Sequence, residues 1–395
     1  MSLHVVTAGE SHGPCLTAVI EGLPSGIPVD ESLIRTDLAR RQLKTGAGGR
    51  MAIETDAARI LAGVMEGRTT GAPVALQIAN ADFAKWQGRT VPAYTTPRPG
   101  HADLAAVVKY GYSDIRPALE RASARETAAR VAAGAVFRAF LAEFGIHVGG
   151  FVSSLGGVQS PVEGEAVSEA VVRQARSFAT QMPDAASDAL AQKAIEQAKA
   201  EGETLGGVIE VAAFGLPPGL GAFATPERRL DARLGAAVLA VQAVKGVEIG
   251  DAFANSARCG TEAHDPIRLA DGELVRTSNR CGGVEGGISN GGTLWLRAAM
   301  KPIPTTLKPQ PTVDLANGKE GETRYERSDF CPVPRAVVVL ESVVAHVLAD
   351  ALIEKLGGDS LAEMRPRFDA LRRLSLADCG LADAPASHVF WNPPQ

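Results

Sequence analysis

The sequence predicts one large domain of mixed helices and strands that contains an internal pseudo-repeat. Three observations support this prediction. An apolar strand, a Gly-Leu-Pro turn and a helix follow one another twice, several long segments have helical periodicity, and no Pro/Ser-rich linker divides the chain. A chain of 395 residues is long enough for two or three ordinary domains. The missing linker favours a single domain over residues 1–395, with a C-terminal tail from about residue 374.

The first copy of the repeat reads LTAVIEGLPSGIPVDESLIRTDLARR, residues 16–41. It predicts a strand, a turn, and a helix with Asp30 as N-cap and with Ile34 and Leu38 on one face. The second copy, residues 206–241, has an apolar strand, GLPPG and an Arg-rich helix in the same order. The two copies favour a pseudo-repeat. The alternative is that Gly-Leu-Pro is merely a common turn.

Three further segments predict helices. In residues 119–145, Ser123 and Glu126 match the S-x-x-E capping box, and Gly145 follows the Ala-rich body as a stop signal. Residues 185–200 predict a polar amphipathic helix at the periphery. Residues 335–356 are apolar on most faces and predict a buried helix that ends at Gly357. The Gly-rich stretch 282–292 is expected to be a loop.

Composition excludes several classes of function. The net charge of -5 gives no general attraction to nucleic acid or to anionic membranes, so any anionic ligand needs a local cluster of Arg and Lys. Five scattered cysteines without a CxxC pair predict reduced thiols, no disulfide framework and no zinc site. The chain also lacks the carboxylate/histidine spacing that is typical of a metal centre. No signal peptide and no apolar run of about 18 residues is apparent, which predicts a soluble cytoplasmic protein.

Titratable residues in three constrained turns are the candidates for chemistry. His12 lies in GESHGP, His101 in PRPGHADL and Asp329 in RSDFCPVP. A single histidine is more often structural than catalytic, but three such turns, two with an arginine close in sequence, favour acid/base chemistry. The remaining histidines lack this context and are interpreted as structural.

Arginines accompany these turns. Arg125 falls in the first turn of a predicted helix, where the helix dipole prefers an acid. A bound anion there would account for it; the alternative is pairing with Glu126 or Glu120. Together the arginines favour a ligand with more than one anionic group. The chain lacks the G-x-G-x-x-G, P-loop and G-x-S-x-G patterns, which leaves an anion-binding enzyme with acid/base histidines.

Three stretches together resemble the signatures of the chorismate synthase family, in order: GESHGPCLTAVIEGLP, LERASARETAARVAAGAV and RSDFCPVPRAVVVLESV. RPGHADL, AVKGVEIGDAF, EGGISNG and AAMKPIPTT fall between them, so the resemblance covers about residues 3–356. It implies an α+β fold, an α/β sandwich with helices packed between two antiparallel β-sheets, assembled as a homotetramer. The pseudo-repeat would then correspond to the two halves of the sandwich.

The resemblance also implies an activity. The substrate would be 5-enolpyruvylshikimate 3-phosphate, which loses phosphate and a C6 proton in a 1,4-anti elimination to give chorismate. The cofactor would be reduced FMN, with NADPH as a candidate reductant. A substrate with two carboxylates and a phosphate agrees with the arginines near the three turns.

Residue roles follow from the same resemblance. His12 would protonate the departing phosphate, His101 would lie by the flavin N1/O2 edge, and Asp329 would deprotonate flavin N5. Substrate contacts are expected from Arg41, Arg50, Arg98, Ser123, Arg125 and Arg327. Flavin contacts are expected from Arg121, Ala122, Ser123, Gln242, Ala243, Gly286, Lys301, Pro302, Ile303, Pro304, Thr305 and Arg327.

One position departs from the family pattern. Ala47 stands where an arginine is expected, in the run Lys44-Thr45-Gly46-Ala47. The anion site is therefore one cation short unless Lys44 or Arg50 compensates. Two other functions remain as alternatives: a flavin-dependent oxidoreductase, and a non-catalytic phosphate-ester binding protein. His12, His101 and Asp329 argue against the second.

Overall fold

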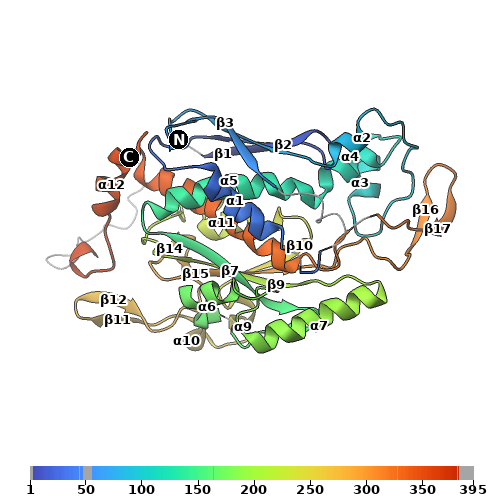
Figure 1. Cartoon of the computed structure of the whole chain (residues 1–395). Helices are drawn as coiled ribbons and strands as arrows, with labels where there is room; N and C mark the ends of the chain where they lie inside the picture. Colours follow the sequence, from blue (N-terminus) through green and yellow to red (C-terminus); the bar gives the residue numbers. More distant parts are fainter. Residues whose placement is uncertain are drawn as a thin grey trace, which may run out of the picture.

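Two antiparallel sheets enclose a layer of helices (Figure 1). The computed structural model describes residues 3–43, 45–47, 56–162, 164–326, 328–379 and 381. The first sheet has the order β1 (His4–Ala8), β2 (Cys15–Glu21), β6 (Val74–Ala79), β3 (Ala58–Ala62). The second has the order β10 (Val244–Ile249), β15 (Leu294–Met300), β9 (Gly207–Phe214), β7 (His147–Leu155), β8 (Val158–Gln159). The predicted α+β sandwich is confirmed.

Four helices form the layer between the sheets: α1 (Glu31–Arg41), α5 (Thr127–Ala142), α8 (Leu230–Leu239) and α11 (Val333–Leu356). Helices α1 and α5 pack on the first sheet, α8 and α11 pack on the second, and α5 packs against α11. The sheets need this layer because each has an apolar inner face that must be removed from water.

The other helices are short, apart from α7. They are α2 (Phe83–Trp86), α3 (Asp103–Tyr110), α4 (Arg116–Ala122), α6 (Glu169–Ala175), α7 (Ala185–Glu201), α9 (Ala252–Asn255), α10 (Gly260–Ala263) and α12 (Leu361–Asp369). Short hairpins are formed by β4 (Val64–Met65) with β5 (Arg68–Thr69), β11 (Ile267–Ala270) with β12 (Glu273–Arg276), β13 (Val284–Glu285) with β14 (Ile288–Ser289), and β16 (Pro311–Asp314) with β17 (Lys319–Glu322). Helix α7 borders β8 outside the helix layer, as predicted for a peripheral helix (Figure 1).

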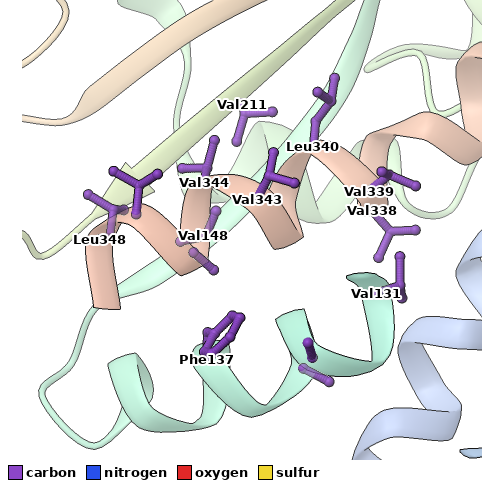
Figure 2. Packing of buried hydrophobic residues seen from close by; sticks show 14 of the residues in the cluster. Val131, Phe137, Val148, Val211, Val338, Val339, Leu340, Val343, Val344 and Leu348 are labelled. Atoms are coloured by element: carbon purple, nitrogen blue, oxygen red, sulfur yellow. The ribbon is translucent and has the colours of Figure 1, made fainter. Parts of the chain in front are cut away.

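Helix α11 forms the centre of the core. Its valines and leucines, among them Val338 and Val344, interdigitate with Phe137 of α5 and with Val148 and Val211 of the second sheet (Figure 2). By length and composition α11 would also suit a membrane span, although no apolar run of that kind was predicted from the sequence. Most of the helix is buried inside the protein, which accounts for its apolar character.

The crossing of α5 and α11 requires a glycine. A Cβ atom on Gly134 would lie 2.2 Å from Cβ of Ser342. We expect Gly134→Ala to lower the free energy of unfolding by about 1–3 kcal/mol, because the two helices would have to move apart. Gly235→Ala is the matched control, since its Cβ would lie 3.8 Å from the nearest atom, on Val247. The control should be neutral or stabilising by about 1 kcal/mol. Urea unfolding measures both, and equal effects would contradict the prediction.

The predicted pseudo-repeat is present in three dimensions. The strand order β1-β2-β6-β3 in the first sheet has its counterpart in β7-β9-β15-β10 of the second. The two Gly-Leu-Pro turns also share their backbone conformation. Gly22 and Gly215 have φ of +89° and +74°, and Gly26 and Gly219 have φ of +95° and +94°. Only glycine adopts this left-handed region without strain, so the glycines recur in both copies.

Each Gly-Leu-Pro turn is fastened by a hydroxyl from the following hairpin. Thr69 of β5 donates to the carbonyl of Pro24 at 2.7 Å, and Ser289 of β14 donates to the carbonyl of Pro217 at 2.7 Å. The alternative that Gly-Leu-Pro is an accidental turn is therefore wrong.

Most predicted helix boundaries are confirmed, but the capping box is not. Asp30 accepts from the amide of Leu33 at 2.9 Å, and α11 ends before Gly357. Ser123 accepts from the amide of Arg125 instead of that of Glu126, and a 3₁₀ turn precedes α5. The Glu126 carboxylate does not reach back to Ser123, because stronger partners from distant segments, such as Thr7, occupy it.

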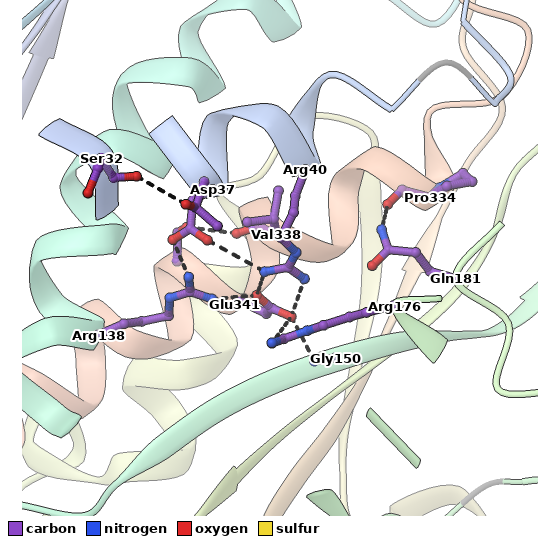
Figure 3. Close-up of polar contacts among 12 residues, drawn as sticks. Ser32, Asp37, Arg40, Arg138, Gly150, Arg176, Gln181, Pro334, Val338 and Glu341 are labelled. Carbon is purple, nitrogen blue, oxygen red and sulfur yellow. Dashed lines mark hydrogen bonds and ion pairs between the residues drawn. The ribbon is translucent and has the colours of Figure 1, made fainter. Parts of the chain in front are cut away.

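A buried ion network joins α1, α5 and α11 in the layer between the two sheets (Figure 3). Glu341 of α11 is fully buried and accepts from Arg40 at 2.5 and 2.7 Å, from Arg138 at 2.8 Å, and from the amide of Gly150 at 2.9 Å. Arg176 adds an ion pair at 3.4 Å. Burial alone would raise the pKa of Glu341, but the surrounding guanidinium groups, that of Arg40 first, lower it to about 2. The carboxylate is therefore ionised at neutral pH.

The expected tail contacts the body where the structure describes it. The carbonyl of Leu374 accepts from the amide of Leu274 at 2.6 Å, and the amide of Leu376 donates to the carbonyl of Gly272 at 3.1 Å. These bonds extend the β11–β12 hairpin. The domain boundary itself stays a prediction.

Candidate active site

The predicted site residues gather where α5 and α11 begin. The turn between β1 and β2 carries His12, Arg125 lies in the 3₁₀ turn that leads into α5, and Asp329 lies just before α11. In the two halves of the fold β6 corresponds to β15 and α5 corresponds to α11. The segment that leads from β6 into α5 and the one that leads from β15 into α11 therefore occupy equivalent positions. The pseudo-repeat thus brings segments far apart in sequence to one end of the sandwich (Figure 1).

His12 is held on two sides. Its backbone amide donates to Oε2 of Glu120 at 2.7 Å, and its Nδ1 lies 2.7 Å from Oε1 of the same carboxylate. The Trp86 ring packs over the imidazole, with ring centroids 4.6 Å apart. The histidine side chain is only 20% exposed, so these contacts define its position.

Asn80 ties the His12 turn to Arg125. Its Nδ2 donates to the carbonyls of Glu10 at 3.0 Å and Gly13 at 2.8 Å, and its Oδ1 accepts from Nε of Arg125 at 3.0 Å. The hydroxyls of Ser123 and Ser11 are 3.2 Å apart and add a second link. His12, Ser123 and Arg125 are therefore parts of one hydrogen-bonded unit.

Arg41 and Arg125 meet at a buried carboxylate. Asp56 lies 2.6 Å from Arg125 and 3.4 Å from Arg41. Arg41 also donates to Thr127 Oγ1 and to the carbonyl of Ala124, both at 2.8 Å. Burial lowers the pKa of Arg41 to about 10 against the opposing charge of Asp56, and the guanidinium of Arg125 contributes to the lowering. Two largely buried cations at a helix start favour an anionic ligand.

Asp329 has a cation beside it. Arg335, in the first turn of α11, forms an ion pair with the Asp329 carboxylate and is itself largely buried. The carbonyl of Gly46 accepts from the amide of Phe330 at 3.0 Å and from that of Cys331 at 3.1 Å. Ala47 consequently lies next to the Asp329 turn, where the family pattern would place an arginine.

His101 belongs to a second group. Its Nδ1 pairs with Asp103, which is fully buried and also accepts from Nε of Arg98 at 2.8 Å. Burial would raise the pKa of Asp103, but the hydrogen bonds from His101 and Arg98 outweigh it and hold the pKa well below its usual range. Arg98 also reaches Thr305 at 3.3 Å. Arg98 thus holds His101 and Asp103 in place, a role that the sequence did not suggest.

The residues expected to contact a cofactor form a connected chain. Arg121 donates to Thr7 Oγ1 at 3.1 Å, Thr7 donates to Glu126 at 2.6 Å, and Gln242 Nε2 donates to Glu126 at 3.1 Å. The chain continues to the segment after β15, since the amide of Lys301 donates to the carbonyl of Ala243 at 2.9 Å.

The other end of this chain reaches the His101 group. Lys301 Nζ donates to the carbonyl of Gly100 at 2.5 Å, next to His101. The segment of Pro302, Ile303 and Pro304 is held by Thr204, which donates to the carbonyl of Ile303 at 2.7 Å. The two groups are therefore connected through Lys301 and Gly100.

Three expected contacts, Gly286, Arg50 and Arg327, lie elsewhere or outside the described residues. Gly286 lies in the β13–β14 turn, before β15, whereas Lys301 follows the other end of that strand. Within one chain the fold does not bring Gly286 to the site. Lys44, Arg50 and Arg327 lie outside the described residues, so compensation for Ala47 stays a prediction.

Sequence reasoning missed the partners that hold the site residues. They are Asp56, Asn80, Asp103, Glu120 and Arg335. Asp103, Glu120 and Arg335 lie within the quoted motifs. Asp56, Asn80 and Glu120 lie far in sequence from the groups they hold, so no local pattern joins them to those groups.

Comparison with known proteins gives a consistent result. The family profile described as chorismate synthase matches residues 3–353. The chain is 48% identical over 384 residues to a chorismate synthase of Chlorobaculum tepidum. The matched region covers 93% of this chain and 96% of that protein. It is 49% identical over 387 residues to one of Leifsonia xyli subsp. xyli, with coverage of 93% and 96%. A crystal structure of chorismate synthase superposes with a TM-score of 0.77 at 40% identity, covering 93% and 97% of the two chains.

Proposed function

The chain belongs to the chorismate synthase family, and from that premise we propose how its own residues carry out the reaction. The reaction is the 1,4-anti elimination of phosphate from 5-enolpyruvylshikimate 3-phosphate to give chorismate. The enzyme is a lyase of aromatic amino acid biosynthesis, and its family works with a flavin.

The observation that carries the assignment of roles is the cluster of Arg41, Arg125 and Arg335 beside His12 and Asp329. A substrate with three anionic groups requires several guanidinium groups in one place, and the net charge of the chain is -5. The start of α5 adds backbone N–H groups and the positive end of a helix dipole. We propose that the anionic groups of the substrate displace the Asp56 carboxylate as partners of the Arg41 and Arg125 guanidinium groups.

His12 and Asp329 are the proposed acid and base. His12, anchored through Nδ1, has Nε2 left to donate a proton to the departing phosphate oxygen. Asp329 is the proposed carboxylate that takes up a proton on the other side of the reaction, with Arg335 orienting it. The two groups act at opposite ends of a net elimination that releases one phosphate and one proton.

The polar groups around Gln242 suit a flavin, and we propose reduced FMN. Gln242 Oε1 is buried and has no hydrogen-bond partner among the described residues, so it is available to a ligand donor. Arg121, Lys301 and Thr305 would supply donors, and His101 would lie beside the ring. When bound, reduced FMN would supply electron density to the substrate and a site for its C6 proton.

One assay tests the function. Chorismate should form with photoreduced FMN under anaerobic conditions, together with one phosphate per chorismate and no net oxidation of the flavin. Absence of chorismate under these conditions would contradict the proposal. The flavin oxidoreductase alternative predicts rapid turnover of NADPH without the phosphorylated substrate. The same assay with NADPH and oxidised FMN tests whether the protein reduces its own flavin.

Binding of FMN and substrate should be coupled. Because the proposed flavin and substrate residues share Ser123 and the start of α5, each ligand is expected to tighten the other by the same factor. Fluorescence titration of FMN with and without substrate, and the reverse titration, measure both factors. Unchanged affinities would indicate two separate sites.

We further propose a cytoplasmic homotetramer. Large apolar side chains that are exposed in the single chain support an assembly, among them Met65, Val108, Phe223 and Phe253. Light scattering coupled to size exclusion should give four times the mass of the chain. A monomer at micromolar concentration would contradict this.

A further inference from the structure

Glu120 makes two hydrogen bonds to the same residue. One carboxylate oxygen accepts from the backbone amide of His12 and the other lies against its Nδ1, both at 2.7 Å. The Glu120 carbonyl also accepts from the amide of Ser11 at 3.2 Å. We propose that Glu120 is the positioning residue that keeps a proton on Nδ1 of His12 and so makes Nε2 the nitrogen that exchanges protons with substrate. This inference rests on the proposed role of His12.

The proton on Nδ1 is fixed by groups that can only donate or only accept a hydrogen bond. A backbone N–H is always a donor, and an ionised carboxylate is always an acceptor. The contact between Nδ1 and Glu120 is therefore a hydrogen bond only when Nδ1 carries a proton. With Nδ1 engaged in this way, Nε2 is the ring nitrogen left to gain or lose a proton. A cationic imidazole satisfies this arrangement as well as a neutral one does.

The surroundings keep this arrangement in place. Glu120 lies on α4, with its side chain only 14% exposed, and the His12 side chain is 20% exposed. Trp86 covers the imidazole ring, and Asn80 holds the carbonyls on both sides of the histidine turn. Rotation of the ring would break the Nδ1 bond to a carboxylate that is largely withdrawn from water, which is costly.

The variant Glu120→Gln keeps the shape of the side chain but changes which hydrogen bonds it can accept and donate. The amide oxygen of the introduced side chain has to accept from the His12 backbone N–H, because the amide nitrogen cannot. That leaves the NH₂ group facing Nδ1, which must then be unprotonated to accept. The variant therefore favours the opposite neutral tautomer, with the proton on Nε2, and disfavours the cationic ring.

Nitrogen-15 NMR of labelled histidine reads the tautomer directly and without turnover. The chain has only 7 histidines, and a His12→Ala spectrum identifies the signals of His12. At a pH where the ring is neutral, the native protein should show a protonated Nδ1, and Glu120→Gln should show a protonated Nε2. Glu143→Gln is the matched control, since Glu143 pairs with Arg365 at the far end of α5 and should leave the His12 signals unchanged.

Kinetics give the second readout. Glu120→Gln should lower kcat about 10- to 1000-fold with KM changed less than about twofold, because the acid is impaired while the anion site is intact. Glu120→Ala is the second variant; it should lower kcat similarly and give a mixture of tautomers.

A folded Glu120→Gln protein that keeps the native tautomer would overturn the inference, whatever its activity. A reversed tautomer supports it. If the tautomer reverses but kcat is native, the positioning by Glu120 stands and the catalytic role of His12 is the part that fails.

Discussion

His12→Ala is expected to lower kcat about 10²- to 10⁴-fold, the usual contribution of a positioned general acid. Folding should be nearly unaffected, since Asn80 holds the turn that carries His12 through the carbonyls on both sides of it. Single-turnover formation of chorismate with reduced FMN isolates the chemical step, and urea unfolding checks stability. The affinity for FMN should be retained, because the proposed flavin residues lie around Gln242 and Lys301.

His264→Ala is the control for this experiment. His264 lies outside the group of residues described at the site, in the segment after α10, so its removal should leave the rate unchanged. A native rate for His12→Ala across neutral pH would remove His12 from the mechanism. A loss of both activity and stability would indicate that the histidine mainly holds its turn.

Glu341→Ala is expected to lower the free energy of unfolding by about 3–5 kcal/mol, the cost of breaking a buried ion network on one side. Without this carboxylate, the guanidinium groups of Arg40, Arg138 and Arg176 lie close together with less opposing charge (Figure 3). Glu354→Ala is the control. Glu354 pairs with Arg228 and Arg233 near the surface, where such pairs contribute about 0–1 kcal/mol. Equal losses in the two variants would contradict the prediction.

The contribution of Glu341 to the free energy of unfolding should decrease as the pH falls. Its pKa is lowered from the ordinary 4.5 to about 2 in the folded chain. A lowered carboxyl pKa stabilises the folded state above the unfolded-state value, and this stabilisation is lost as the pH falls through the folded-state value. The difference in unfolding free energy between native protein and Glu341→Ala should therefore be largest above about pH 5 and shrink towards about pH 2.

Local sequence patterns predicted the secondary structure well where neighbours along the chain decide it. The N-cap Asp30 and the stop at Gly357 were predicted because capping involves residues within one turn of the helix end. The capping box at Ser123 failed for the opposite reason. The Glu126 carboxylate binds Thr7, which is 119 positions away, and no local pattern reports that competition.

In the candidate site, too, local sequence indicated some residues while others depend on contacts between distant segments. The turns of His12, His101 and Asp329 were found from their Gly and Pro neighbours, and the family resemblance supplied their roles. Their partners were not found. Glu120 is 108 positions from His12, and Asp56 is 69 positions from Arg125. A solvent-exposed arginine and one that is bound to a buried carboxylate look the same in a sequence.

By itself the sequence determined the family and the pseudo-repeat, because motif order, glycine positions and apolar periodicity are read from neighbours along the chain. The family resemblance then implied the sandwich of helices and sheets and the candidate site residues. Only the tertiary structure decided which carboxylate orients which histidine, which arginines are held by Asp56 and Asp103, and that Gly286 lies at the other end of β15. Those facts depend on how two sheets and four helices pack. Packing sets distances between residues whose separation along the chain carries no information about them.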